Sequence, residues 1–409
     1  MPGYDLIVVG GGPAGMMAAG RAAERGRRVL LLEKGSALGR KLLITAGGRC
    51  NVTNSAPLPE FLKTFGRQGE FLRDAFKGFS NLELLAWLHA RKIETIEERK
   101  GRVFPASQDA RVILRALLDF MASAGVEVQV QRPVEKLWIE GGALRGVEAG
   151  GRIESPRVLL ATGGLSYPAT GSTGDGYALA REAGHSIAPT FPAVVAFETV
   201  ETWPREIQGT PIKNVHLRAT SGERKIAEIF GEALWTHYGI SGPAVLDISR
   251  EIVPMLAAGD PVTLRLDLRP NDTEEALDER LLFAIKKDGK KQVLSVLGDW
   301  VAARTAVALL RLCEVDPKKK MNQVGKSDRK RIVRIVKRLE LHLARPRPIE
   351  EAIVTGGGVA LSEVDPRRME SRLLKGLHFA GELLDLAGPS GGYNLQAAFS
   401  TGYLVGDVV

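Results

Sequence analysis

The sequence predicts a mixed α/β protein whose nucleotide-binding Rossmann domain is split by an insertion. Three observations support this prediction. A glycine-rich turn joins an apolar strand to a helix at the start of the chain, the texture changes near residue 190, and strand-like segments return after residue 346. We therefore expect a discontinuous Rossmann domain over residues 1–189 and 346–409, a β-rich insert over 190–270 and a basic helical insert over 271–345.

The first strand, turn and helix have the spacing of a dinucleotide-binding site. Tyr4 to Val9 is an apolar run of strand length, and Met16 to Ala23 has helical composition. Between them, Gly10 permits a tight turn, Gly12 lets a pyrophosphate approach the backbone, and Gly15 lets the helix pack against the strand. The helix start offers free N–H groups and a positive dipole end to the phosphates. The expected phosphate contacts are Gly10, Gly12, Pro13, Ala14 and Gly15.

The second strand, Arg28 to Leu32, ends at an acidic residue, Glu33. A carboxylate at this position can accept hydrogen bonds from both hydroxyls of an adenosine ribose, and it would repel a 2′-phosphate. The pattern therefore indicates FAD or NAD rather than NADP. The alternative interpretation is a glycine-rich turn that binds no ligand.

Composition narrows the class of protein. The 409 residues are 44% hydrophobic, which is enough for a full core and for two or three domains. The two cysteines, Cys50 and Cys313, cannot form a disulfide framework or a zinc site, so we expect no metal and a cytoplasmic location. Cys313 lies in an apolar helical stretch and is expected in the core. No apolar run approaches the ~20 residues of a membrane helix, and the early first strand leaves no room for a signal peptide.

The net charge of +8 is concentrated in one segment. Residues 271–347 hold 19 Lys/Arg and 11 Asp/Glu, a balance equal to that of the whole chain. Such a concentration suits a polyanion such as RNA, and a solvated helix face on a basic protein is the alternative. The candidate RNA contacts are Lys318, Lys319, Lys320, Lys326, Arg331, Arg334 and Arg338.

Apolar periodicity predicts the elements between these landmarks. In the first part of the chain we expect helices over residues 70–90 and 109–124 and strands over 134–139, 144–149 and 157–161. Thr/Val-rich runs in the insert, over 194–199, 216–220 and 262–268, indicate a small antiparallel sheet or barrel. In the last helix of the insert, one apolar face is expected to be buried opposite the basic side chains. That face comprises Ile332, Ile335, Val336, Leu339 and Leu343.

Several blocks far apart in the sequence share a further pattern. They are Gly39-Arg-Lys41 with Ile44 to Asn54, Ala161 to Gly176, Thr236 to Pro243, Val354 to Val359, and Phe379 to Gln396. This pattern closely resembles the BaiN/RdsA family of FAD-dependent oxidoreductases, and the resemblance covers nearly the whole chain. It implies a glutathione-reductase-like FAD domain interrupted by a β-barrel-like and helical insert.

The resemblance also implies tightly bound FAD, with NADH or NADPH as a transient electron donor. Phe379-Ala-Gly-Glu382 resembles the second FAD motif, and Gly391-Gly-Tyr-Asn394 opens a helix whose N-terminus can face the flavin N1–C2=O edge. Because the chain carries no second dinucleotide fingerprint, the nicotinamide is expected to dock over the flavin. The FAD contacts expected beyond the first turn are Glu33, Lys34, Arg40, Lys41, Arg49, Cys50, Asn51, Val134, Ala161, Thr162, Gly163, Gly381, Glu382, Gly392, Tyr393, Asn394, Leu395 and Gln396.

Three residues are candidate catalytic groups. Cys50 lies where disulfide reductases carry a cysteine pair, but the second cysteine is absent, so dithiol chemistry is excluded and Cys50 is a candidate proton donor. Tyr167 and His237 lie in family blocks expected to face the flavin, where they could orient a substrate or relay a proton. For each of the three, the alternative is a purely structural role.

The sequence is compatible with three functions. Members of the family have been linked to reduction of carbon–carbon double bonds, one branch acting on a uridine of ribosomal RNA and another on unsaturated bile-acid intermediates. The chain could reduce uridine to dihydrouridine while the basic insert holds RNA. It could instead reduce a small unsaturated molecule or oxidise an amine. The third function is that of a flavin-loaded RNA-binding protein without turnover.

Overall fold

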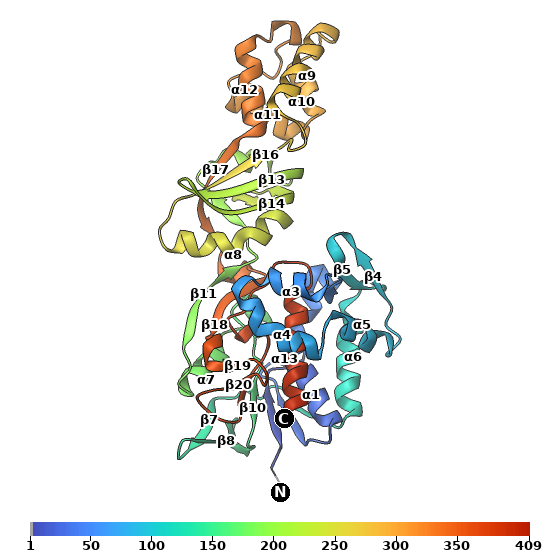
Figure 1. Ribbon diagram of the computed structural model, residues 1–409, viewed down its shortest axis with the longest axis vertical. Helices are drawn as coiled ribbons and strands as arrows, with labels where there is room; N and C mark the ends of the chain where they lie inside the picture. Colours follow the sequence, from blue (N-terminus) through green and yellow to red (C-terminus); the bar gives the residue numbers. More distant parts are fainter. Residues whose placement is uncertain (1–2) are drawn as a thin grey trace. The chain divides into compact units, whose positions relative to one another are not determined.

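The computed structural model describes residues 3–409, which form two compact units (Figure 1). The first, called the Rossmann unit below, comprises the chain up to Pro192 together with Ile349–Val409. The second, the insert unit, comprises Ala193–Pro348. Among these residues, the model has no helix whose length and hydropathy would allow it to cross a lipid bilayer.

The Rossmann unit is built on a seven-stranded sheet. In spatial order its strands are β19 (Val364–Asp365), β20 (Glu370–Ser371), β21 (Leu377–Phe379), β10 (Val158–Leu160), β1 (Leu6–Val9), β2 (Val29–Leu32) and β6 (Glu127–Gln129). The strands from β21 to β6 are parallel, and the two strands at the other edge are antiparallel. Every residue of β1, β2, β10 and β21 is buried, as expected for a parallel sheet covered on both faces.

Helices of the Rossmann unit surround this sheet. Helix α1 (Pro13–Glu24) connects β1 to β2 and packs against α13 (Tyr393–Val408) and α6 (Ala110–Ser123). The other helices are α2 (Arg40–Ile44), α3 (Leu58–Thr64), α4 (Gly69–Gly78), α5 (Asn81–His89) and α7 (Asp175–Glu182).

The single helix expected over residues 70–90 is wrong, because the chain forms α4 and α5 instead. Ser80 separates the two as an N-cap. Its hydroxyl accepts the Leu82 N–H at 3.1 Å, while the Glu83 carboxylate accepts the Ser80 N–H at 2.9 Å. This reciprocal capping starts a new helix inside an apolar pattern that continues across it.

Three smaller sheets complete the Rossmann unit. The first runs β3 (Thr53–Asn54), β5 (Arg102–Pro105), β4 (Thr95–Glu98), and the second runs β7 (Lys136–Glu140), β8 (Ala143–Glu148), β9 (Arg152–Glu154). The third pairs β11 (Ile187–Ala193) with β18 (Val354–Val359).

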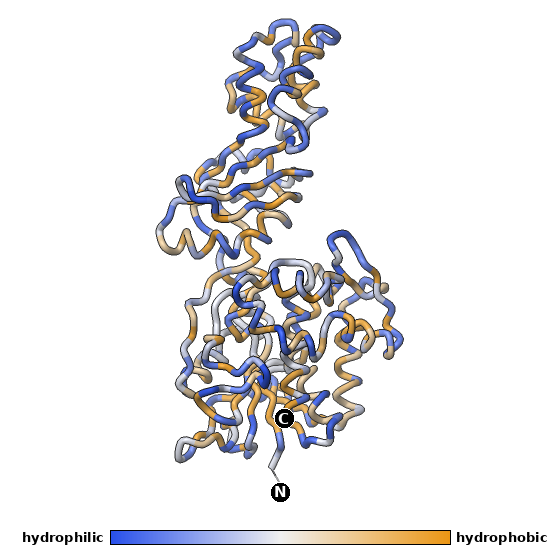
Figure 2. The backbone as a smooth tube through the Cα atoms, in the orientation of Figure 1, coloured by the Kyte–Doolittle hydropathy of each residue, from blue (hydrophilic) through white to orange (hydrophobic). Residues whose placement is uncertain are grey.

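The insert unit combines a closed barrel with a group of helices. The barrel order is β12 (Phe197–Thr199), β15 (Gly239–Ser241), β14 (Arg224–Trp235), β13 (Pro211–Ser221), β16 (Val262–Asp267) and β17 (Leu339–Pro346), and α8 (Pro243–Ala257) packs against β14. Between β16 and β17 lie α9 (Glu274–Lys287), α10 (Val293–Gly298), α11 (Ala303–Leu312) and α12 (Lys326–Lys337). Figure 2 shows hydrophilic and hydrophobic residues alternating along these helices, as in helices with one buried face.

The helix expected to extend to Leu343 is shorter, and this expectation is wrong for its last part. Helix α12 ends at Lys337, and β17 begins at Leu339. Leu339, Leu341 and Leu343 are buried and alternate with exposed residues, which is the period of a strand. The spacing of four between Leu339 and Leu343 is compatible with both a helix and a strand, so the sequence alone does not decide between them.

Candidate functional site

The Rossmann unit contains a cavity of about 330 Å³, lined by residues that follow directly after the parallel strands. Gly10 follows β1, Glu33 follows β2, Ala161 follows β10 and Ala380 follows β21. The carboxyl ends of parallel strands are where Rossmann-type sheets bind ligands. All the lining residues belong to the Rossmann unit.

The three glycines of the first turn differ in why the structure has glycine at each position. Gly10 has a φ of +107°, and a Cβ there would lie 2.6 Å from the Ala161 carbonyl oxygen. A Cβ on Gly15 would lie 2.0 Å from the Gly10 carbonyl oxygen, so α1 could not pack as it does. A Cβ on Gly12 would meet no other atom of the described residues within 4 Å. The turn therefore leaves open space at Gly12, in front of the α1 N-terminus, and this cradle fits the diphosphate of FAD.

The nucleotide end of the cavity is organised by Glu33. Its Oε2 accepts the Gly11 N–H at 2.8 Å and its Oε1 accepts the Gly35 N–H at 2.7 Å, which fixes the carboxylate at the cavity wall. Glu33 and Gly10 also line a small adjoining recess, together with Lys34 and Val134. The expected adenosine contacts are thus gathered at one end.

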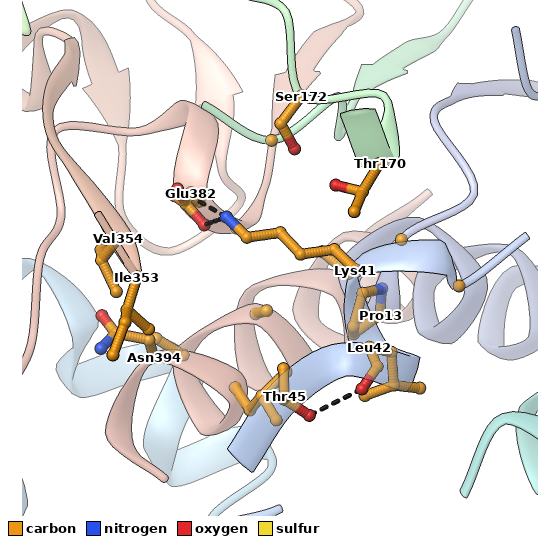
Figure 3. Close-up of a pocket in the computed structure, with 18 of the residues that line it drawn as sticks. Pro13, Lys41, Leu42, Thr45, Thr170, Ser172, Ile353, Val354, Glu382 and Asn394 are labelled. Atoms are coloured by element: carbon orange, nitrogen blue, oxygen red, sulfur yellow. Dashed lines mark hydrogen bonds and ion pairs between the residues drawn. The ribbon is translucent and has the colours of Figure 1, made fainter. Parts of the chain in front are cut away.

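An ion pair stands at the middle of the cavity (Figure 3). Lys41 Nζ donates to Glu382 Oε2 at 2.7 Å and to Ser166 Oγ at 2.6 Å. Glu382 Oε1 accepts the Ser166 hydroxyl at 2.8 Å and the Thr355 N–H at 2.9 Å. Both charged side chains are about four-fifths buried. Glu382 therefore fixes Lys41 and the surrounding wall, and any ligand hydroxyl must share an already occupied carboxylate.

The N-terminus of α13 forms the opposite end of the cavity. Gly391, Gly392, Asn394 and Leu395 line it, and both glycines have positive φ. The Asn394 side chain accepts the Gly388 N–H at 2.8 Å and donates to the Gly388 carbonyl oxygen at 2.9 Å, so it shapes the loop before the helix.

Tyr393 and Gln396 are the two expected FAD contacts of α13 that point into the protein. The Tyr393 ring packs edge-on against Phe61 at 4.7 Å between centroids. Gln396 is buried and bonds to Thr53 and to the Phe79 carbonyl oxygen. Neither is a lining residue of the cavity.

Three consecutive expected contacts, Arg49, Cys50 and Asn51, have three different environments. Asn51 lines the cavity, and its Oδ1 is buried without a hydrogen-bond partner among residues 3–409. Cys50 is fully buried, and burial raises the pKa of its thiol to about 12. Arg49 stacks over Phe104 at 4.1 Å and forms an ion pair with Glu98. Only Asn51 of the three lines the cavity.

The candidate catalytic residues lie outside the lining of the cavity. Tyr167 is held with a φ of +53° before a short turn of helix, and His237 is an exposed residue of the insert unit whose ring packs on Tyr238 at 4.8 Å. None of Cys50, Tyr167 and His237 is among the lining residues. The lining residues with titratable side chains are Glu33, Arg40, Lys41, Arg102 and Glu382.

Sequence reasoning missed one wall of the cavity. Arg102 and Phe104 of β5 line it, as do Thr45 and Ala46. No motif marks Arg102 and Phe104, and only the pairing of β3 with β5 brings them to the site. A strand pairing between segments so far apart in sequence is not visible in local periodicity.

The candidate RNA contacts in the insert unit differ in their pairing. Lys319 and Arg331 both form ion pairs with Asp328 at 2.7 Å, and Arg338 pairs with Glu274 at 2.8 Å. The remaining candidates are exposed and have no acidic partner in the described part of the chain, and these are Lys318, Lys320, Lys326 and Arg334. Lys326 and Arg334 lie with exposed Lys330 at spacings of four residues along α12, and we call these three the α12 stripe.

The Rossmann sheet, the glycine cradle and the long cavity define an FAD-dependent oxidoreductase. The chain belongs to the HI0933-like family, whose Rossmann-domain description matches residues 4–408. This match confirms the resemblance found in the sequence and the predicted fold class.

Two curated relatives span nearly the whole chain. The chain is 32% identical over 403 residues to a 3-dehydro-bile acid delta(4,6)-reductase from Clostridium scindens, covering 98% of this chain and 97% of the relative. It is 30% identical over 407 residues to a ribosomal RNA dihydrouridine synthase from Escherichia coli, with 98% and 97% covered.

Solved structures show the same fold at low identity. The 3-ketosteroid delta1-dehydrogenase from Sterolibacterium denitrificans superposes with a TM-score of 0.55 at 15% identity, covering all of this chain and 99% of that one. The 3-ketosteroid-delta4-(5alpha)-dehydrogenase from Rhodococcus jostii RHA1 gives 0.52 at 17% identity, with 98% and 96% covered.

Proposed function

We propose that the protein reduces a carbon–carbon double bond that is conjugated to a carbonyl group, with FAD in the cavity and NADH or NADPH as electron donor. The two relatives described above share this chemistry, because a 4,6-unsaturated 3-oxo steroid and a uracil ring both carry such a bond. The proposal thus joins two substrates of different size through one reaction.

The observation that carries the proposal is the shape and lining of the cavity. The glycine cradle, Glu33 and the N-terminus of α13 all line it, and these residues would hold an extended FAD molecule. FAD supplies hydride transfer when it is bound. The α13 N-terminus would stabilise negative charge on a flavin carbonyl group bound beside it. The largely apolar lining near Leu395 and Val354 would exclude water from the ring.

Within this class, we propose a uridine of ribosomal RNA as the substrate. The α12 stripe supports this choice, because three exposed cations at helical spacing offer a track for successive phosphates. A small conjugated carbonyl compound is the second candidate, supported by the bile-acid reductase, to which the chain is slightly more similar.

The test uses purified protein with its flavin, reduced without oxygen by NADH or NADPH. Ribosomal RNA or a 3-oxo-4-ene steroid is then added, and flavin reoxidation and product mass are measured. A uridine that gains two hydrogens supports the RNA substrate, and a saturated steroid with unchanged RNA supports the second candidate. Flavin that is reoxidised by neither would contradict the proposed reaction.

A further inference from the structure

Asn51 presents an unpaired acceptor at the cavity wall. Its Oδ1 atom is buried and has no hydrogen-bond partner in the described residues, although the residue lines the cavity. Leaving such an oxygen unpaired carries a desolvation cost. An N–H group of a ligand that reached this oxygen from the cavity would remove this cost.

Arg102 offers donors from the neighbouring strand. The Val52 N–H, next in the chain to Asn51, donates to the Val103 carbonyl oxygen at 2.9 Å and ties Asn51 beside β5. Arg102 of β5 lines the same cavity, and its hydrogen bonds to the Arg99 carbonyl oxygen and to Glu98 are both long at 3.3 Å. A guanidinium has five N–H donors, so several are left for a ligand carbonyl.

The charge balance at this wall is positive. Glu98 is the shared carboxylate of two guanidinium groups, since Arg49 bonds to its Oε1 and Arg102 to its Oε2. Both guanidinium groups approach the Phe104 ring, at 4.1 and 5.7 Å. One carboxylate cannot neutralise two cations, so the wall attracts an oxygen that carries partial or developing negative charge.

Two non-glycine residues of the segment that carries Asn51 have positive φ. Ala46, which lines the cavity, has a φ of +49°, and Cys50, next to Asn51, has a φ of +61°. Such residues are strained, and strained residues of this kind cluster at ligand sites because the surrounding structure holds them there. The strain therefore supports a binding role for the segment that carries Asn51.

We propose that Asn51 Oδ1 and the Arg102 guanidinium bind the edge of an imide, with Asn51 accepting its N–H and Arg102 donating to its carbonyl oxygen. Two molecules required by the proposed function, on which this inference rests, carry that edge. One is the pyrimidine ring of the flavin, and the other is uracil. A steroid enone has the carbonyl oxygen but lacks the N–H, so the Asn51 contact discriminates between the substrate classes.

The experiment compares full-length variants at this wall with matched controls. Asn51→Leu and Arg102→Met each remove one partner, Asn51→Asp keeps an acceptor oxygen, and Arg99→Met removes an exposed cation from the same β4–β5 hairpin. Dissociation constants for FAD and visible spectra are measured first. Binding of 1-methyluracil and of a 3-oxo-4-ene steroid to the flavin-loaded protein is then followed by perturbation of the flavin spectrum.

Two results support the proposal, and they show whether the flavin or uracil carries the bound imide edge. If the flavin is bound, Asn51→Leu and Arg102→Met weaken FAD about tenfold and shift its spectrum, while Asn51→Asp and Arg99→Met stay within about threefold of the parent. If uracil is bound, FAD affinity is unchanged, Asn51→Leu weakens only 1-methyluracil, and Arg102→Met weakens both small ligands.

Two results overturn the proposal. Folded Asn51→Leu that binds FAD and both small ligands like the parent would show that Oδ1 has no ligand partner. Equal weakening of 1-methyluracil and the steroid by Asn51→Leu, with unchanged FAD affinity, would show that Asn51 only shapes the cavity. Should the leucine variant not fold, Asn51→Ala, which also lacks a side-chain acceptor, replaces it under the same criteria. Binding as expected without turnover of any substrate contradicts the proposed function alone.

Discussion

At the scale of single residues, burial separates side chains that look equally reactive in the sequence. Arg49, Cys50 and Asn51 form one motif, yet only Asn51 lines the cavity. A positive φ at Cys50 turns the chain between its neighbours, and no local pattern predicts which side chain then faces the ligand. Gly10 and Gly15 are different, because each has a steric reason within the protein that the spacing of the motif predicts.

Cys50 is expected to be unreactive in the folded protein. Its thiol is fully buried with a pKa of about 12, so almost none of it is thiolate at neutral pH. Alkylation with iodoacetamide at pH 8, read by mass spectrometry, should leave Cys50 unmodified until the protein is unfolded. Cys50→Ala should retain turnover within about threefold. Rapid labelling of the native protein, or loss of product with Cys50→Ala, would restore Cys50 as a proton donor.

Gly12→Ala should leave the fold intact and weaken the binding of FAD. Gly12 has a φ of −80°, and a Cβ there meets no protein atom within 4 Å, so the fold should tolerate alanine. The same methyl group would occupy the space of the pyrophosphate and weaken FAD at least about tenfold. Thermal unfolding of the apoprotein and FAD titration measure the two effects. Gly78→Ala, equally free of contacts, is the control, and parent-like FAD affinity in Gly12→Ala would contradict the phosphate site.

At the scale of elements, local periodicity in the sequence predicts individual strands well and predicts the junctions between elements poorly. The strands β1, β2 and β10 follow from apolar runs, whereas the α4–α5 break depends on one capping box at Ser80. The end of α12 at Lys337 depends on β17 pairing with β12 and β16, which are distant in sequence. Tertiary pairing decides between helix and strand where one apolar pattern fits both.

The α12 stripe should carry a measurable part of RNA binding. Lys326→Gln, Lys330→Gln and Arg334→Gln together remove three exposed cations, and the slope of log affinity against log salt should fall by about 2. Filter binding with a single-stranded ribosomal RNA fragment over a range of salt concentrations measures this slope. The control is the triple variant Lys63→Gln, Lys77→Gln and Lys290→Gln, which removes the same charge from dispersed exposed positions. Equal slopes in the two triple variants would exclude the stripe as a phosphate track.

At the scale of the whole molecule, the barrel is closed by the two strands through which the chain enters and leaves the insert unit. β12 is the first barrel strand and β17 the last, and Phe197 pairs with Pro346. The Arg347 N–H donates to the Ala196 carbonyl oxygen at 2.9 Å just outside this pair. The sequence predicts a sheet or barrel in the insert, but the strand order is non-local and follows only from the structure.

Joining Ala196 to Arg347 through two glycines should leave a Rossmann unit that still folds and binds FAD. The two residues lie at the spacing of paired strands, so the short connection replaces the insert unit without strain. All lining residues of the cavity are retained in this shortened chain. Co-purified flavin and a cooperative thermal transition measure the result. Colourless or aggregated protein that also fails to bind added FAD would show that the insert unit is needed for the cofactor site.

The adjacency of β12 and β17 also bears on how such enzymes diversify. A segment whose two ends emerge side by side can be exchanged, enlarged or shortened as a cassette while the surrounding domain keeps its hydrogen bonds. Selection on the guest segment and selection on the host domain are then largely independent. A lineage could change its substrate by exchanging the inserted segment and keep the redox chemistry of the surrounding domain.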